Sequence, residues 1–151
     1  MRPVITAEDV GDSTLVVRTD YSDETAWRAV VAHLSADPDS ANHLVEGPAW
    51  NGATVDDVLA ATPRDHPDGV VFIADAATMQ DPHPLLAVTT VRREDCEDPE
   101  DHAYELSNGR EFRVLPAGVL DVSANLFIAN MDFPEFAAMA QRDPSGWYRG
   151  V

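Results

Sequence analysis

The residues from Val70 to Ala74 are all apolar and show no alternation between apolar and polar positions. A strand with one face in water alternates, whereas a strand that is covered on both faces stays apolar along its length. The run, which ends at Asp75, therefore predicts a strand that is buried on both faces. Such a strand requires a sheet with covering elements on either side.

The first half of the chain has a strand-then-helix order that leads to this strand. A β-branched run over 14–19 precedes a helix whose N-cap we assign to Ser22 and whose apolar face extends to Leu34. A short strand over 43–46 follows, and then a helix that begins after Thr54. Strands in this alternation pair in parallel, with the helices packed over the sheet.

The second half predicts further strands with less regular connections. We expect strands over 85–91 and 111–115, joined by an acidic and solvated excursion over 92–110. Residues 116–122 predict a helix or a helical turn. Residues 125–130 either continue that helix or form a short central strand.

No internal repeat, linker or low-complexity tract divides the chain. We therefore expect a single α/β domain over residues 1–151. Its sheet is predicted to be mixed and mostly parallel, with three or four flanking helices.

Charge excludes two classes of partner. Acidic residues number 27 against ten basic residues, all of them arginine, and the formal net charge is −17. Nucleic acids and anionic membrane surfaces carry charge of the same sign and would repel the chain. We expect no nucleic-acid partner and no membrane partner.

The sequence lacks the usual signatures of cofactor and metal sites. Cys96 is the only cysteine, so neither an internal disulfide nor a thiolate cluster is expected. The five histidines lack zinc-site spacing, and no phosphate loop, nucleophile elbow or dinucleotide fingerprint occurs. We expect no cofactor and no metal. Because no signal peptide or membrane-spanning segment is found, we expect a cytoplasmic protein.

Asp20 and Asp75 each follow a predicted apolar strand, which is where ligands bind in open α/β sheets. If the two strands are parallel neighbours, the carboxylates share a crevice and the pKa of one of them rises. His83 then completes a catalytic acid/base group, and the loop with Trp50 closes the crevice. The other interpretation, which we favour, is that both aspartates cap turns or helices.

Arg18 and Arg113 lie in strands that are otherwise largely apolar. Each guanidinium either binds a carboxylate or phosphate of a ligand, pairs with an internal carboxylate, or faces solvent at an edge strand. For Arg18 the candidate internal partners are Asp20 and Asp75. We favour an internal pair, because carboxylates are abundant in this chain.

Asn125, Asn130 and Asp132 surround a short apolar segment. Their side chains suit the orientation of a ligand, and they equally suit the fixing of an irregular backbone. Asp132 and Glu135 have the spacing of a capping box, which favours the structural role.

The tryptophans and Phe72 divide into two groups. Trp27 and Phe72 are expected in the core, because they lie on the apolar face of a helix and in the central strand. Trp50, in a turn-rich loop, and Trp147, near the end of the chain, are candidates for a recognition surface.

The segment Asn130-Met131-Asp132-Phe133, preceded by Asn125 and followed by Phe136, belongs to a wider pattern along the chain. On this pattern the chain resembles a family of small uncharacterised bacterial proteins that is grouped as a domain of unknown function. The resemblance spans most of the chain and implies a compact single domain, but it implies no activity. The other segments of the pattern are 15–20, 22–23 with Trp27, 72–75, 83–86, 110–113 and 148–150.

Two functions from different classes are consistent with these features. The first is an accessory protein that binds another protein, or a small or peptide ligand, with its acidic surface steering basic partners. An immunity-type inhibitor that covers a basic active site is one form of it. The alternative is a small cofactor-independent lyase, isomerase or cyclase of a biosynthetic cluster, with strand-end carboxylates as its acid/base groups.

Overall fold

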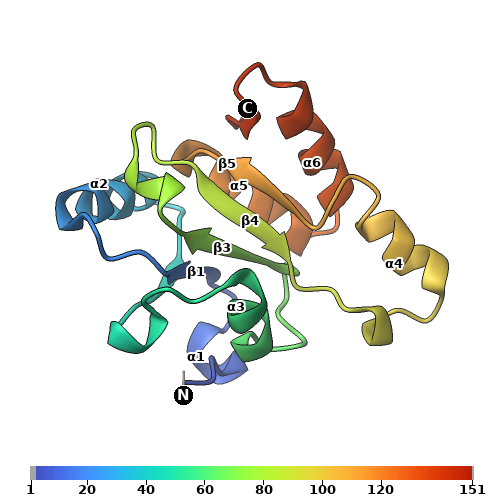
Figure 1. Cartoon of the computed structure of the whole chain (residues 1–151). Coiled ribbons are helices and arrows are strands. Elements are labelled where there is room, and N and C mark those ends of the chain that lie inside the picture. Colours follow the sequence, from blue (N-terminus) through green and yellow to red (C-terminus); the bar gives the residue numbers. More distant parts are fainter. Residues whose placement is uncertain (1–2, 151) are drawn as a thin grey trace.

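One mixed sheet runs through the protein, with its six strands in the order β2-β1-β3-β4-β5-β6 (Figure 1). The computed structural model describes residues 3–150, and within them six α-helices and three short 3₁₀ turns connect the strands. The strands are β1 (Thr14–Arg18), β2 (Asn42–Val45), β3 (Val70–Ala74), β4 (Leu85–Thr89), β5 (Glu111–Val114) and β6 (Trp147–Tyr148). The helices are α1 (Ala7–Val10), α2 (Glu24–Leu34), α3 (Val55–Ala61), α4 (Pro99–Glu105), α5 (Pro116–Phe127) and α6 (Phe133–Arg142), and the 3₁₀ turns are Pro48–Trp50, Ala77–Met79 and Arg93–Asp95.

The predicted parallel unit forms one half of the sheet. β1 pairs in parallel with β2 on one side and with β3 on the other, and α2 and α3 connect these strands. β4 is antiparallel to both β3 and β5, and the short β6 is parallel to β5. The expected α/β fold with a mixed, mostly parallel sheet is therefore confirmed.

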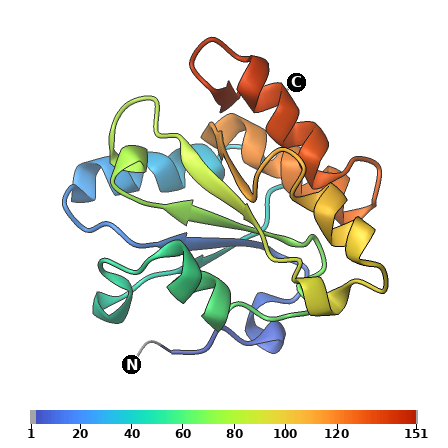
Figure 2. The same ribbon diagram turned by 45° about the vertical axis from the view of Figure 1, so that its right-hand side comes forward.

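Successive residues of the central strands enter two separate cores. Val16 and Phe72 belong to the cluster under α2, α5 and α6, whereas Val17 and Ile73 belong to the cluster that α1 and α3 cover. Figure 2 shows these two sets of helices on opposite sides of the sheet. Every residue of β1 and of β3 is buried, which explains why neither strand alternates in polarity.

The helices depart from the sequence prediction in number and in detail. Six are present among residues 3–150, instead of three or four, because the excursion over 92–110 contains α4 and a short α1 precedes β1. The segment after residue 125 continues α5 instead of forming a strand. Asp23, not Ser22, caps α2. No helix among the described residues is long and apolar enough to cross a membrane.

The expectation that Trp50 lies on a recognition surface is wrong. Its side chain is buried in the cluster beneath α3, together with Val58. The reason is the 3₁₀ turn that ends at Trp50, after which the amide of Gly52 donates to the carbonyl of Thr19 at 2.9 Å and ties the loop to the sheet. The loop therefore closes the core and not a crevice.

We expect Trp50→Ala to lower the free energy of unfolding by about 3–5 kcal/mol, because it leaves a large cavity in the core. Urea denaturation followed by circular dichroism measures the loss. Trp147→Ala is the matched control, since that ring is half-buried and lies 5.2 Å from the Arg149 guanidinium. Its expected cost is about 1 kcal/mol or less. Equal losses in the two variants would contradict the assignment of Trp50 to the core.

Candidate functional site

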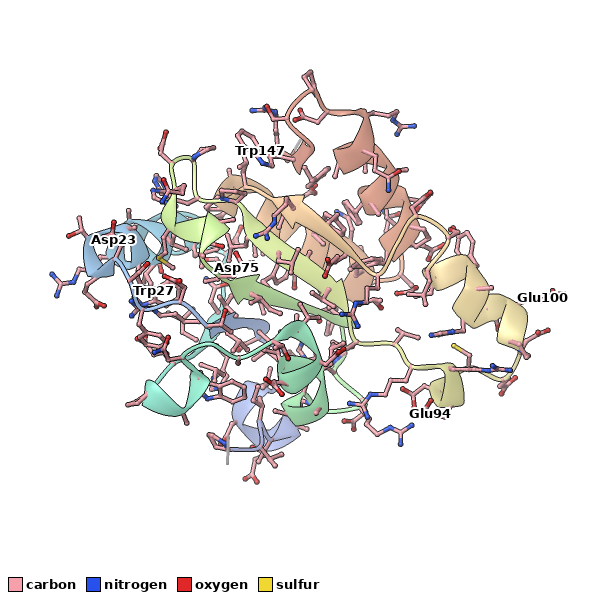
Figure 3. The ribbon with its side chains drawn as sticks, viewed as in Figure 1. Asp23, Trp27, Asp75, Glu94, Glu100 and Trp147 are labelled. Carbon is pink, nitrogen blue, oxygen red and sulfur yellow. The ribbon has the colours of Figure 1, made fainter. Side chains whose placement is uncertain are left out.

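The carboxyl ends of β1 and β3 lie side by side, with Arg18 opposite Ala74 in the register. Asp20 and Asp75 follow these strands, so both begin at the same edge of the sheet. Asp75 is labelled in Figure 3. This edge is the position that the sequence singled out for a ligand site. The side chains, however, take different partners there.

Asp75 forms a bidentate ion pair with Arg113. The guanidinium Nη1 lies 2.8 Å from Oδ1 and Nη2 lies 2.9 Å from Oδ2. The hydroxyl of Thr78 also donates to Oδ1 at 3.2 Å. Burial would by itself raise the pKa of Asp75, but the hydrogen bonds and charge of Arg113, together with Thr78, hold that pKa below its ordinary value. This direction is opposite to the rise that an acid/base pair of carboxylates requires.

Asp20 stabilises a turn. Its Oδ1 accepts the backbone amide of Ser22 at 3.0 Å and also the Ser22 hydroxyl. The backbone carbonyl of Asp20 accepts a hydrogen bond from Nε of Arg18 at 2.9 Å. These contacts correspond to the capping interpretation of Asp20, and none of them connects it to Asp75.

Arg18 is 2% exposed and pairs with carboxylates other than the two that the sequence suggested. Its Nη1 lies 3.0 Å from Glu24 and 3.6 Å from Glu46. The guanidinium carbon stands 4.1 Å from the centre of the Tyr21 ring and 5.1 Å from that of Trp27. Nη2 alone has no hydrogen-bond partner among the described residues.

The alternation of strand side chains explains this choice of partners. Ile73, Leu86 and Arg113 are aligned across β3, β4 and β5, so Arg113 reaches over β4 toward the sheet face that α3 covers. Asp75 lies two residues after Ile73 and meets Arg113 on that face. Arg18 contacts Trp27, which belongs to the cluster on the opposite face. The sheet therefore separates the two guanidinium groups.

His83 does not join either aspartate. Its backbone is left-handed, with φ of 67°, and its Nδ1 lies 2.9 Å from the carbonyl oxygen of Thr78. Its ring centre is 6.2 Å from that of His33. Among the described residues, no hydrogen bond connects this ring to Asp20 or Asp75.

Asn125, Asn130 and Asp132 shape the turn between α5 and α6. The amide of Asn125 donates to the carbonyl of Asp121 at 2.8 Å, and its oxygen accepts from the amide of Asn130 at 2.9 Å. Asp132 forms the predicted capping box at the start of α6 and accepts the Tyr104 hydroxyl at 3.2 Å. We call residues 126–132 the α5–α6 corner.

The corner presents an exposed apolar pair that the sequence did not reveal. Phe127 is 48% exposed and Ile128 is 69% exposed, although both read as core residues of a helix or strand. They become exposed because α5 ends at Phe127 and the left-handed Ala129, with φ of 55°, turns the chain away. In the sequence, Asn125 and Asn130 on either side of the apolar segment are the local signal of a turn between α5 and α6.

These two side chains line a groove of about 330 Å³, which we call the apolar groove. α5 forms one wall, and the segments before β1 and before β2 form the other. Two carboxylates, from different loops, belong to the lining. The other lining residues used below are Asp12, Thr14, Asp39 and Ser123.

Comparison with known proteins places the chain in a family. Residues 13–151 match the family model described as Domain of unknown function (DUF6924). The chain belongs to this family. All six strands of this DUF6924 protein and helices α2 to α6 lie within the matched region. No match to the chain was found among curated proteins or among solved structures.

The ion pair at the strand ends of this DUF6924 protein predicts a pH-dependent stability. Asp75→Asn keeps the shape and the Thr78 contact but removes the charge that faces Arg113. We expect it to lower the free energy of unfolding at pH 7 by about 1–3 kcal/mol.

The pH dependence gives this prediction its sign. Because the pKa of Asp75 is lower in the folded state, the stabilisation is present above the pKa of the unfolded carboxyl and is lost as pH falls through the folded pKa. The gap between wild type and Asp75→Asn should therefore close below about pH 4. Urea denaturation at a series of pH values measures it, and a gap that widens toward acid would overturn the assignment.

Proposed function

We propose that this protein is a cytoplasmic binding protein that associates with a basic protein partner through the apolar groove. The observation that carries the proposal is the pair Phe127 and Ile128, exposed next to each other over a groove that also contains Asp12 and Asp39. Apolar side chains ringed by charged groups are typical of protein-binding sites. An immunity-type inhibitor, which covers a basic active site, is one form of such a protein.

The apolar part of the groove supplies binding energy. Complete burial of a Phe or Ile side chain contributes about 1.5–3 kcal/mol relative to exposure, and both are already partly covered here. Adjacent anchors at the centre of a contact dominate affinity when polar groups around them exclude water. Phe127 and Ile128 fit this role because Asp12 and Asp39 lie beside them.

The charge selects the class of partner. A net charge of −17 attracts basic proteins over distances of about 10 Å at moderate ionic strength and speeds their encounter. It repels nucleic acids and anionic membranes. A partner with an apolar side chain flanked by arginine or lysine matches the groove in both respects.

We do not propose an acid/base enzyme at the strand ends. Asp75 is held in an ion pair that favours its charged form, and Asp20 stabilises a turn. A carboxyl that donates or accepts protons near neutral pH needs a raised pKa and a free lone pair. The arrangement of these side chains therefore gives the enzyme alternative no support.

The double variant Phe127→Ser with Ile128→Ser tests the proposal. Native mass spectrometry of the wild type, recovered gently from its own cell lysate at low salt, should show an added polypeptide that salt releases. Once that polypeptide is identified, the double variant should bind it at least about tenfold more weakly, because two apolar anchors are lost. Binding is measured on immobilised partner.

Val4→Ser is the matched control. Val4 is 76% exposed and lies outside the apolar groove, so its substitution should leave the affinity unchanged. The same affinity in wild type and double variant would show that the partner binds elsewhere. A wild type that retains no polypeptide at low salt would contradict the proposal as a whole.

A further inference from the structure

A second hollow lies on the other flank of the α5–α6 corner, between the corner, α4 and the segment before β3. It has a volume of about 280 Å³, and we call it the acidic cavity. Figures 1 and 2 both show α4 next to α6 at this end of the molecule. Its lining residues used here are His66, Asp68, Glu105, Leu126, Met131 and Asp132.

A buried chain of polar contacts leads from the lining of the apolar groove to His66 and Asp68, which form the inner wall of the acidic cavity. The hydroxyl of Thr14 donates to that of Ser123 at 2.9 Å, and Ser123 donates to Oδ2 of Asp68 at 2.6 Å. Nε2 of His66 lies 2.7 Å from Oδ1 of Asp68, and the two side chains are 1% and 3% exposed. Oδ2 of Asp68 thus accepts from Ser123, and Oδ1 accepts the backbone amide of Val70 at 3.3 Å.

The ring of His66 is unpaired at this wall. Both ring nitrogens are buried and have no hydrogen-bond partner among the described residues, although Nε2 lies close to Oδ1 of Asp68. The imidazole tautomer with its proton on Nε2, the nitrogen beside the carboxylate of Asp68, presents Nδ1 as a hydrogen-bond acceptor. A buried polar atom without a partner costs free energy, and a ligand with N–H groups would remove that cost.

The outer wall of the acidic cavity carries two carboxylates that have no arginine partner among the described residues. Glu105 accepts the Thr89 hydroxyl, and Asp132 accepts the Tyr104 hydroxyl. No arginine among residues 3–150 forms an ion pair with Glu105 or Asp132.

Electrostatics agrees with this lack of cations. Burial and the nearby charge of Asp132 raise the pKa of Glu105 above its ordinary value, against the opposing effects of Thr89 and His102. A cation placed beside Glu105 would stabilise its charged form.

The remaining lining is apolar. Leu126, Met131 and Phe133 contribute to the cavity, so its polar groups stand beside hydrocarbon. A ligand that fits both parts carries a positive group with several N–H donors on an alkyl chain. Arginine and lysine side chains have this construction.

We propose that the acidic cavity binds a guanidinium or ammonium group on an alkyl chain, supplied by a basic side chain of the protein partner. This inference rests on the proposed function, because the corner residues that line the acidic cavity adjoin those that line the apolar groove. The partner then inserts an apolar residue on one flank of the corner and a basic residue on the other.

The test uses small probes on the isolated protein, so it does not depend on the partner. Butylguanidinium and butylammonium carry the charge, and butylurea has nearly the shape of butylguanidinium without it. We expect the cations to shift the backbone amide signals of Val91, Ala129 and Met131 in NMR titrations, and butylurea to bind at least about tenfold more weakly. Nα-acetylarginine methylamide, which presents the group on a peptide backbone, should bind as well as butylguanidinium. Clearly weaker binding of it would indicate a small free alkyl cation as the natural ligand and overturn the assignment to a partner side chain.

Glu105→Gln removes one negative charge and keeps an oxygen that accepts the Thr89 hydroxyl. We expect it to weaken butylguanidinium binding about tenfold, in line with the loss of a charge-assisted hydrogen bond. Asp132→Asn, which preserves the N-cap of α6, should act in the same direction. Glu100→Gln is the matched control, because Glu100 is exposed on the same helix and points away from the sheet (Figure 3).

Each outcome of these titrations has one meaning. Equal binding of butylurea and butylguanidinium, an unchanged affinity in a correctly folded Glu105→Gln variant, or shifts confined to other parts of the protein would overturn the inference. None of these results tests the proposal that the apolar groove binds a partner. Conversely, an unchanged partner affinity after substitution of Phe127 and Ile128 would overturn the proposed function while cation binding persisted.

Discussion

Burial of β1 and β3 on both faces determines how the rest of the chain is arranged. Their side chains enter two cores in alternation, so helices must cover the sheet from both sides. α2, α5 and α6 provide one cover, and α1 and α3 provide the other. Where helices cover the sheet, ligands and partners have access at its ends and at the helix connections. The α5–α6 corner is one such connection.

The excess of carboxylates gives different parts of this surface different properties. At the strand ends, Arg18 and Arg113 form ion pairs with nearby carboxylates and neutralise their charge. At the corner, Glu105 and Asp132 lack such a partner among the described residues, and apolar side chains stand beside them. The few arginines of the chain pair with carboxylates of the first region, and the same shortage of cations supports the binding role that we propose for the second.

Sequence reasoning found the structural use of several polar residues more readily than any site. The capping box of Asp132 and Glu135 was predicted because it depends on residues three positions apart. Asp20 and Asp75 were correctly placed at one edge of the sheet, but their partners depend on which face each side chain takes. Ile73, Leu86 and Arg113 are aligned only by the pairing register of three strands, and no local pattern records that register.

By itself the sequence determined the double-sided burial of the central strands, their parallel connection through helices, the capping box of Asp132 and Glu135, and the net negative charge. These properties arise from neighbours in the chain and from composition, so they are readable without coordinates. Only the tertiary structure decided that Trp50 is core, that Arg113 rather than Arg18 holds Asp75, and that Phe127 and Ile128 are exposed. Those outcomes depend on which distant elements pack against each side chain, and apolar residues look alike in sequence whether or not an element covers them.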